Sequence, residues 1–173
     1  MEQTEPRTVT CRCGAVALAA SGPPIMAVSC YCADCRRAGE EFAALPSAPR
    51  TMDEDGGTPC VLYRKDRVRC IRGQEFLQER RLTPGTPTRR VLATCCNSPM
   101  FGDFTRGHWL SLYRARFAGG GAAPQMRIMT RSRRADVTLD DEVPNYPGFS
   151  AKFMFKLLAA WVAMAFRKPD MGF

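Results

Sequence analysis

The residues of this chain best suited to chemistry are cysteines, because seven of its nine fall into three short clusters. The clusters read Cys11-Arg12-Cys13-Gly14, Cys30-Tyr31-Cys32-Ala33-Asp34-Cys35 and Cys95-Cys96-Asn97-Ser98-Pro99. Thiolates are soft ligands that suit Zn(II), and cysteines one or two residues apart can bind a single ion from one turn. The spacing therefore indicates zinc sites before any fold is considered.

The first and third clusters have the features of metal-binding turns. Gly14 and Asn97 directly follow the cysteines, and both residue types tolerate the left-handed backbone of a tight turn. The two clusters would complete a closed, structural four-thiolate site from Cys11, Cys13, Cys95 and Cys96. Because successive strand residues point to opposite faces, Cys95 and Cys96 can share a metal only if the strand bends there.

The second cluster supplies three thiols, those of Cys30, Cys32 and Cys35. A zinc ion with three protein ligands keeps a position for water or substrate, which catalysis needs. The alternative is that Cys60, Cys70 or His108 closes the site and makes it structural. We expect these three to be non-ligands, because the two cysteines share strand faces with apolar neighbours and a lone histidine does not make a Cys–His pair.

The length and charge of the chain limit its class. At 173 residues it can form one domain with its own core, since domains commonly hold ~100 to 150 residues. The first residues lack the basic start and apolar run of a secretory signal, so we expect a reducing, cytoplasmic location without disulfides. The formal charge of +8 favours an anionic partner without identifying it.

Most of the chain has the pattern of short β-strands separated by turn residues, so the expected fold class is mainly β. The expected strands cover 8–11, 15–19, 26–30, 61–63, 68–71, 76–82, 90–94, 110–113 and 126–129. A short helix is expected over 36–44, directly after the second cluster. Together these elements form one zinc-binding domain, residues 1–148.

A C-terminal helix is predicted over 150–166, with Ser150 as its N-cap and Pro169 just beyond its end. It belongs to an extension, residues 149–173, that we expect to pack on the domain or on a second subunit, which would make a homo-oligomer. Its apolar stretch is shorter than the ~20 residues of a membrane span, so no transmembrane span is expected. Arg167 and Lys168 keep a membrane-surface role open as the alternative.

Three motifs follow one another along the chain: Cys11-x-Cys13-Gly14, Cys30-x-Cys32-x-x-Cys35-Arg36-Arg37 and Cys96-Asn97-Ser98-Pro99-Met100-Phe101. In this order they resemble the motifs of the glutathione-dependent formaldehyde-activating enzyme family, which includes centromere protein V. The resemblance implies a β-tent fold of small antiparallel sheets and two zinc ions per chain. It implies structural ligands at Cys11, Cys13 and Cys96. It also implies that the zinc of the active centre is held by Cys30, Cys32 and Cys35.

One motif departs from the family pattern. The last motif of the family usually reads Cys-x-x-Cys-Gly-x-Pro, but Ala93 stands three residues before Cys96 in this chain. The adjacent Cys95 is the thiol available as the fourth structural ligand. Asn97 in place of glycine is a milder change, because asparagine tolerates the same backbone region.

The leading functional hypothesis is a zinc enzyme that acts on adducts of a small thiol. The resemblance implies a carbon-sulfur lyase that binds a small anionic thiol such as glutathione and forms an S-hydroxymethyl thiol from formaldehyde. An exposed zinc ion stabilises a thiolate, which is the nucleophilic form of a thiol. Asp34 is a candidate proton carrier, and Arg36 and Arg37 are candidates to attract substrate carboxylates.

The competing hypothesis is a non-enzymatic zinc module that binds protein or nucleic acid, with both metals structural. The net positive charge supports this interpretation. Nucleic acid is the less expected partner, because the basic residues form no long run and are not interleaved with aromatic residues that stack on bases.

Overall fold

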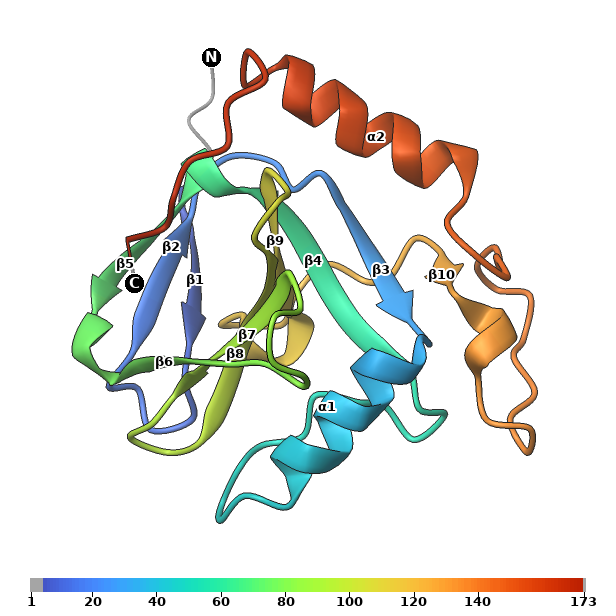
Figure 1. Ribbon diagram of the computed structural model, residues 1–173, viewed down its shortest axis with the longest axis horizontal. Coiled ribbons are helices and arrows are strands. Elements are labelled where there is room, and N and C mark those ends of the chain that lie inside the picture. Colours follow the sequence, from blue (N-terminus) through green and yellow to red (C-terminus); the bar gives the residue numbers. More distant parts are fainter. Residues whose placement is uncertain (1–4, 173) are drawn as a thin grey trace.

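The protein is built mainly of β-strands, as Figure 1 shows for the computed structural model, which describes residues 5–172. In this part of the chain the strands form two sheets, accompanied by two α-helices. The mainly β fold class with a C-terminal helix, predicted from the sequence, is confirmed.

The smaller sheet has three antiparallel strands in the order β1-β2-β5. These strands are β1 (Arg7–Thr10), β2 (Ala17–Ala20) and β5 (Val68–Arg72). The larger sheet has seven strands in the order β10-β3-β4-β9-β8-β7-β6, and only the short β10 runs parallel to its neighbour. Its strands are β3 (Met26–Cys30), β4 (Thr58–Arg64), β6 (Leu77–Arg80), β7 (Thr88–Ala93), β8 (Ser98–Phe104), β9 (Trp109–Tyr113) and β10 (Arg127–Ile128).

The larger sheet separates two cores, because successive residues of a strand point to opposite faces. Val61 and Tyr63 of β4 enter a core shared with the three-stranded sheet. Cys60 and Leu62 of the same strand enter a second core, to which both helices contribute. The strand residues that line the cavity described below therefore lie on the face of this sheet that carries Cys60 and Leu62.

The first helix, α1 (Ala33–Ala43), begins three residues before the predicted start at residue 36. The reason is Cys32, which occupies the N-cap position and accepts a hydrogen bond of 3.4 Å from the backbone N–H of Cys35. A cap of this kind satisfies a backbone donor that the first helical turn leaves unpaired. Cys32 and Cys35 of the second cluster therefore belong to the beginning of the helix, whereas Cys30 is the last residue of β3.

The second helix, α2 (Ala151–Val162), begins at the predicted cap, where Ser150 Oγ accepts a hydrogen bond of 3.1 Å from the Phe153 N–H. It ends four residues before the predicted end at residue 166, and Ala165 and Phe166 have left-handed φ values of 50° and 57°. Within the described residues, no helix has the length and apolar character needed to cross a membrane.

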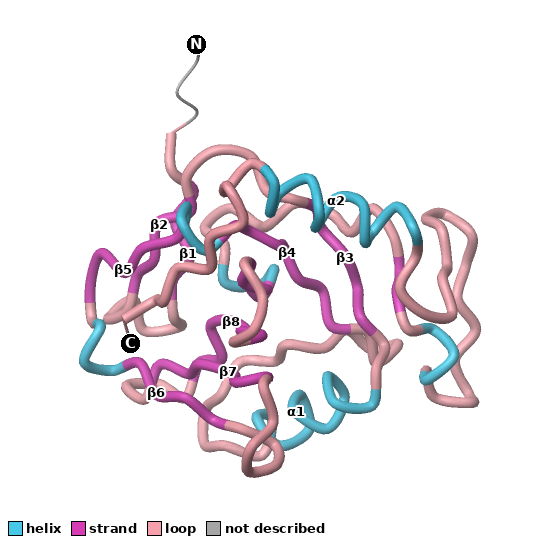
Figure 2. Tube along the Cα trace, turned by 45° about the horizontal axis from the view of Figure 1, so that its top comes forward, coloured by secondary structure: helices cyan, strands magenta, loops and turns pink. Residues whose placement is uncertain are grey.

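One side of α2 packs on the domain. Phe153 and Leu157 are each 5% exposed and belong to the second core. The Nε2 atom of His108 lies 2.8 Å from the carbonyl oxygen of Leu157. This hydrogen bond connects α2 to the loop before β9. Figures 1 and 2 show α1 and α2 at opposite ends of β3 and β4, which run between them.

Candidate metal centres

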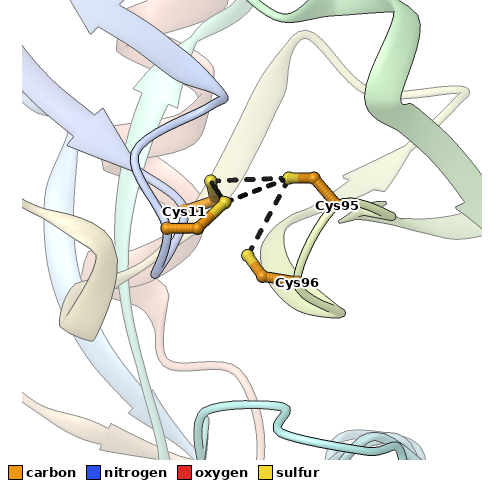
Figure 3. A group of neighbouring side chains, drawn as sticks. Cys11, Cys95 and Cys96 are labelled. Atoms are coloured by element: carbon orange, nitrogen blue, oxygen red, sulfur yellow. Dashed lines mark hydrogen bonds between the residues drawn. The ribbon is translucent and has the colours of Figure 1, made fainter.

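The first centre joins two turns that belong to different sheets. Cys11 and Cys13 lie between β1 and β2, whereas Cys95 and Cys96 lie between β7 and β8. The four thiol groups all lie within 4.8 Å of one another. The Sγ atom of Cys95 lies 3.8 Å from that of Cys11, 3.5 Å from that of Cys13 and 3.9 Å from that of Cys96 (Figure 3).

These separations fit a tetrahedral zinc ion. Four thiolates at a Zn–S distance of ~2.3 Å place their sulfur atoms ~3.8 Å apart, whereas the sulfur atoms of a disulfide lie ~2.0 Å apart. The structure thus brings together the four thiols that the sequence placed in one site. With four protein ligands, such a site leaves no coordination position for a substrate.

The backbone bends at both turns in the way that the shared site requires. β7 ends at Ala93, before the two adjacent cysteines, and Asn97 has a left-handed φ of 51°. In the other turn Gly14 has a φ of 79°, and its N–H donates a hydrogen bond of 3.1 Å to the carbonyl oxygen of Cys11. Because Cys95 and Cys96 lie outside a regular strand, their side chains can face the same point.

The environments of the four thiols differ. Burial raises the pKa of Cys11 and of Cys95. Burial also acts to raise the pKa of Cys96. Hydrogen bonds to its sulfur, a 3.0 Å bond with the Ser98 hydroxyl and one from the backbone N–H of Cys13, outweigh burial and lower the pKa of Cys96 to about 6. The centre therefore holds a thiolate at Cys96 with little cost, whereas the thiols of Cys11 and Cys95 ionise more readily when a cation is bound.

The second centre lies at the junction of β3 and α1. Cys30 is the last residue of β3, Cys32 caps the helix and Cys35 lies in its first turn. Their thiol groups lie within 4.8 Å of one another, and no fourth ligand joins this group in residues 5–172. The structure therefore assembles the predicted three-thiol site.

The three thiols of the second centre share negative charge. Hydrogen bonds from Cys30 and Cys35 lower the pKa of Cys32 strongly. The hydrogen bond with Cys32 raises the pKa of Cys30, and hydrogen bonds with Cys30 and Cys32 raise that of Cys35. One thiolate stabilised by two neighbouring thiols forms a soft, anionic donor set, which fits a zinc ion.

A cavity of about 440 Å³ lies beside the second centre, and all three of its cysteines line it. One wall is the face of the seven-stranded sheet that carries Cys60 and Leu62, and another is formed by Phe149 and the first half of α2. Small-molecule sites commonly have volumes of ~300 to 1,000 Å³. The second centre is thus open to a space that can hold a ligand.

Comparison with known proteins agrees with this arrangement. A protein-family model described as glutathione-dependent formaldehyde-activating enzyme matches residues 6–132, which is more than half of the chain. The chain belongs to the glutathione-dependent formaldehyde-activating enzyme family. The resemblance inferred from the three motifs is thereby confirmed, and the family match ends before α2 begins.

Other comparisons add little to the family assignment. No curated protein matches the chain. Among solved structures, the crystal structure of a Rhodobacter sphaeroides protein matches with a TM-score of 0.46 and 19% identity, covering 80% of this chain and 98% of that chain.

Arg90 lines the cavity and was not among the candidate residues named from the sequence. It is 5% exposed, lines the cavity, and donates a hydrogen bond of 3.2 Å to the backbone oxygen of Asp34. Its positive charge contributes to the lowered pKa of Cys32. The period-two pattern of β7 could have identified Arg90. It lies two residues before Leu92, a residue of the second core, so the two side chains point to the same face of the sheet.

The other candidates named from the sequence have different surroundings. Asp34 is exposed and lines the cavity, as a proton carrier would need to. Arg36 and Arg37 do not line it, and the Arg37 guanidinium instead pairs with Glu41 at 2.9 Å. The prediction that Arg36 and Arg37 attract substrate carboxylates therefore stays a prediction, and the guanidinium that lines the cavity is that of Arg90.

The three residues expected to be non-ligands lie outside both thiol groups. Cys60 is 7% exposed and lines the cavity wall, and burial raises its pKa well above the usual value. Cys70 belongs to the small sheet, where its thiol lies 3.3 Å from the backbone oxygen of Arg72. His108 is occupied by its hydrogen bond with Leu157.

Proposed function

We propose that this protein is a zinc-dependent enzyme that joins a thiol to a carbonyl compound, or reverses that reaction, at the second centre. The observation that carries the proposal is that three thiols, and not four, lie together on the wall of a large cavity. A centre with three protein ligands has room for a substrate sulfur, whereas the first centre is closed. The family description, which names glutathione and formaldehyde, supports this reaction class.

Zinc bound by Cys30, Cys32 and Cys35 would stabilise a substrate thiolate, the form in which a thiol attacks carbon. With glutathione and formaldehyde, the sulfur adds to the carbonyl carbon and the thiol proton passes to the carbonyl oxygen, which gives the S-hydroxymethyl thiol. Cleavage of that carbon–sulfur bond in the reverse direction makes the enzyme a carbon-sulfur lyase.

The chain's own side chains can support both parts of this reaction. Arg90 places a buried positive charge beside the thiols, which offsets the negative charge of three thiolates. Tyr113 lines the cavity, is 5% exposed, and burial raises the pKa of its hydroxyl, so it can donate a hydrogen bond to a carbonyl oxygen. Asp34, exposed at the cavity, can accept the proton released by the thiol.

In the same proposal the first centre, formed by Cys11, Cys13, Cys95 and Cys96, holds a structural zinc. Zinc that is bound by four thiolates contributes to folding and takes no part in the reaction. The expected stoichiometry is therefore two zinc ions per chain.

The test compares zinc content and adduct exchange in the wild type and in Cys32→Ser. We expect two zinc ions per chain to fall to one with the circular dichroism spectrum unchanged. Acceleration of glutathione–formaldehyde exchange, measured by NMR, should be lost. Cys70→Ser, which changes a thiol outside both centres, serves as the matched control and should retain both properties.

Two results would contradict the proposal. One is a single zinc ion in the wild type, which would mean that the second centre binds no zinc, or unfolding of Cys32→Ser, which would mean that the second centre is structural. The other is a wild type that holds two zinc ions and accelerates no thiol adduct exchange, which would favour a non-enzymatic binding module.

A further inference from the structure

We propose that the substrate of the second centre has an apolar body, an alkyl or aryl group of roughly six carbons or more. This inference rests on the proposed function, since it describes the molecule whose sulfur the centre would bind. It concerns the walls of the cavity, and not the thiols themselves.

The cavity is larger than the reacting atoms require. Its volume of about 440 Å³ corresponds to about 15 groups of the size of a water molecule, at ~30 Å³ each. A formaldehyde carbon, its oxygen and one sulfur atom would fill only a small part of that space. The rest must be occupied by water or by the remainder of the substrate.

The interior walls favour an apolar occupant over water. The sheet contributes Leu62 and Trp109, and the opposite wall contributes Phe153 and Leu157 of α2. The last two are each only 5% exposed. Water in contact with such side chains lacks hydrogen-bond partners, so its replacement by an apolar group is favourable.

The opening of the cavity is apolar as well. Phe149 and Met154 line the cavity, yet they are 59% and 53% exposed, so they stand where the cavity meets solvent. Both residues follow residue 132, where the family match ends. The lining that would select an apolar substrate is therefore supplied partly by a segment outside the region shared with the family.

Few charges are available to bind a polar body. Asp34 and Arg90 are the carboxylate and guanidinium side chains on the cavity wall in the described part of the chain. Glutathione carries two carboxylates and one ammonium group, and buried charges need partners. Arg90 can match one carboxylate, and Asp34 would repel it. The charged parts of such a thiol must stay at the opening, which leaves the interior for an apolar group.

The reaction on such a substrate balances without a further reactant. The thiol adds across the carbonyl group of an aldehyde, the carbon–sulfur bond forms as the carbon–oxygen π bond breaks, and the thiol proton ends on the oxygen. The apolar body can be attached to the sulfur or to the carbonyl carbon. The same walls would receive it in both cases, and the test separates the two.

The first arm of the test measures binding to the zinc-loaded, full-length protein by calorimetry. The ligands are n-alkanethiols from ethanethiol to hexanethiol and the n-alkanols of equal length. We expect affinity to rise about fourfold for each added methylene in both series, with each thiol binding more tightly than its alcohol. The second arm compares hexanal with formaldehyde as the partner of glutathione, with adduct exchange followed by NMR.

A pair of variants on one helix tests the wall directly. Met154→Gln places an amide on the cavity lining, and Phe155→Gln alters a neighbouring side chain that is 70% exposed and does not line the cavity. We expect Met154→Gln to weaken hexanethiol binding about fourfold or more while ethanethiol binding stays unchanged. Phe155→Gln should leave both affinities at the wild-type value.

The outcomes separate this inference from the proposed function. Affinity that does not change with chain length, together with no preference for hexanal over formaldehyde, would overturn the apolar substrate. Thiols and alcohols that bind equally, with both rising with length, would support the apolar cavity and count against a metal-bound sulfur. If affinity rises with chain length for thiols and alcohols and hexanal is not preferred over formaldehyde, the apolar body is attached to the sulfur. If hexanal is preferred over formaldehyde, the apolar body is attached to the carbonyl carbon.

Discussion

At the scale of single residues, Cys95 joins the four-thiol group although it departs from the motif spacing that the resemblance implied. Ala93 stands where the resemblance led us to expect a cysteine, and it is 0% exposed in the core between the sheets. Because the chain turns directly after β7, the thiol of Cys95 reaches the same centre from two residues further on. The thiol of Cys95 thereby completes the group of four.

Replacement of Cys95 by serine tests this interpretation. We expect Cys95→Ser to lose one zinc ion per chain and to lower the melting temperature by ten degrees or more, because zinc bound by structural thiolates contributes ~10 kcal/mol or more to the folded state. Zinc analysis and thermal denaturation provide the measurements. Cys70→Ser is the control, and equal behaviour of the two variants would remove Cys95 from the site.

Arg90 is expected to matter for the second centre through its charge. A hydrogen-bonded, buried guanidinium beside thiolates is worth ~1.5 to 3 kcal/mol. Arg90→Met should therefore weaken zinc binding at the second centre by about tenfold to a hundredfold, as measured by competition with a chelator. Arg37→Met, an exposed arginine paired with Glu41, is the control. Equal zinc affinity in the two variants would show that Arg90 does not stabilise the thiolates.

At the scale of elements, Gly73 determines how β5 continues toward β6. It has a left-handed φ of 73°, and a side chain there would collide with the backbone oxygen of Ala15. Gly85 has a similar φ of 78°, but nothing lies within 4 Å of its missing side chain. The two glycines have similar left-handed φ values and differ in the space around them.

This difference gives a matched prediction for stability. Gly85→Ala should cost ~1 kcal/mol of unfolding free energy, which is the cost of the left-handed conformation. Gly73→Ala should cost about 3 kcal/mol or more, because the collision with a backbone atom is added. Urea denaturation measures both values. Similar losses in the two variants would show that the backbone near Ala15 can move away freely.

His108 fixes α2 to the body of the protein. Its ring stacks on Trp161 at 5.6 Å between centroids, and its Nε2 must carry the proton that is donated to the Leu157 oxygen. Burial lowers the pKa of His108, and the positive charges of Lys168, Lys65 and Arg64 act in the same direction. The folded protein therefore favours the neutral ring.

The sign of the resulting pH dependence follows from this shift. Below pH ~6.5 the unfolded chain binds a proton at His108 more readily than the folded chain does, so stability falls as the pH decreases. We expect the unfolding free energy to decrease from pH 7.5 to 5.5 in both the wild type and His108→Gln, and to decrease more in the wild type. The difference between the two proteins should reach at most ~1.4 kcal/mol per pH unit, which is the contribution of one proton. Parallel curves for the two proteins would contradict a depressed pKa.

The outer face of α2 also has a bearing on assembly. Phe155, Leu158 and Val162 are 70%, 50% and 54% exposed. The predictions of a homo-oligomer formed through this helix, and of an extension that begins at residue 149, stay predictions. The contacts of Phe153 and Leu157 show only how its inner face packs.

At the scale of the whole molecule, the first centre links the two sheets. Its thiols come from the β1–β2 turn of the three-stranded sheet and from the β7–β8 turn of the seven-stranded sheet. Removal of this zinc would therefore act on the packing between the sheets more than on either sheet alone. The second centre joins only β3 to the adjacent α1.

Chelation should reveal this difference. In Cys32→Ser, which keeps the first centre alone, a strong chelator should speed amide hydrogen exchange in β1, β2 and β5 by tenfold or more. Exchange in β3 and β4 should change less, because neither strand borders a turn that carries the thiols of the first centre. Mass spectrometry of exchanged peptides measures both. An equal effect throughout the chain would indicate that metal loss unfolds the molecule as one unit.

The sequence by itself determined the features that depend on neighbouring residues. β3 has the predicted bounds of 26–30, Ser150 caps α2, and the first and third cysteine clusters lie at turns as their residue types indicated. The second cluster differs, because α1 begins within it and not after it. Strand β8 was not predicted, because Pro99 and the turn residues before it have the pattern of a loop. Local hydrogen bonding and backbone preference account for the successes and for this miss.

Only the tertiary structure decided which distant residues meet. The spacing of Cys95 and Cys96 permits a shared metal, but the fold brings them to Cys11 across 84 residues. Arg90 reaches the second cluster across 56 residues, and α2 supplies part of the cavity wall from the far end of the chain. These contacts arise from the burial of apolar faces against one another, a property of the assembled sheets and helices that no local spacing contains.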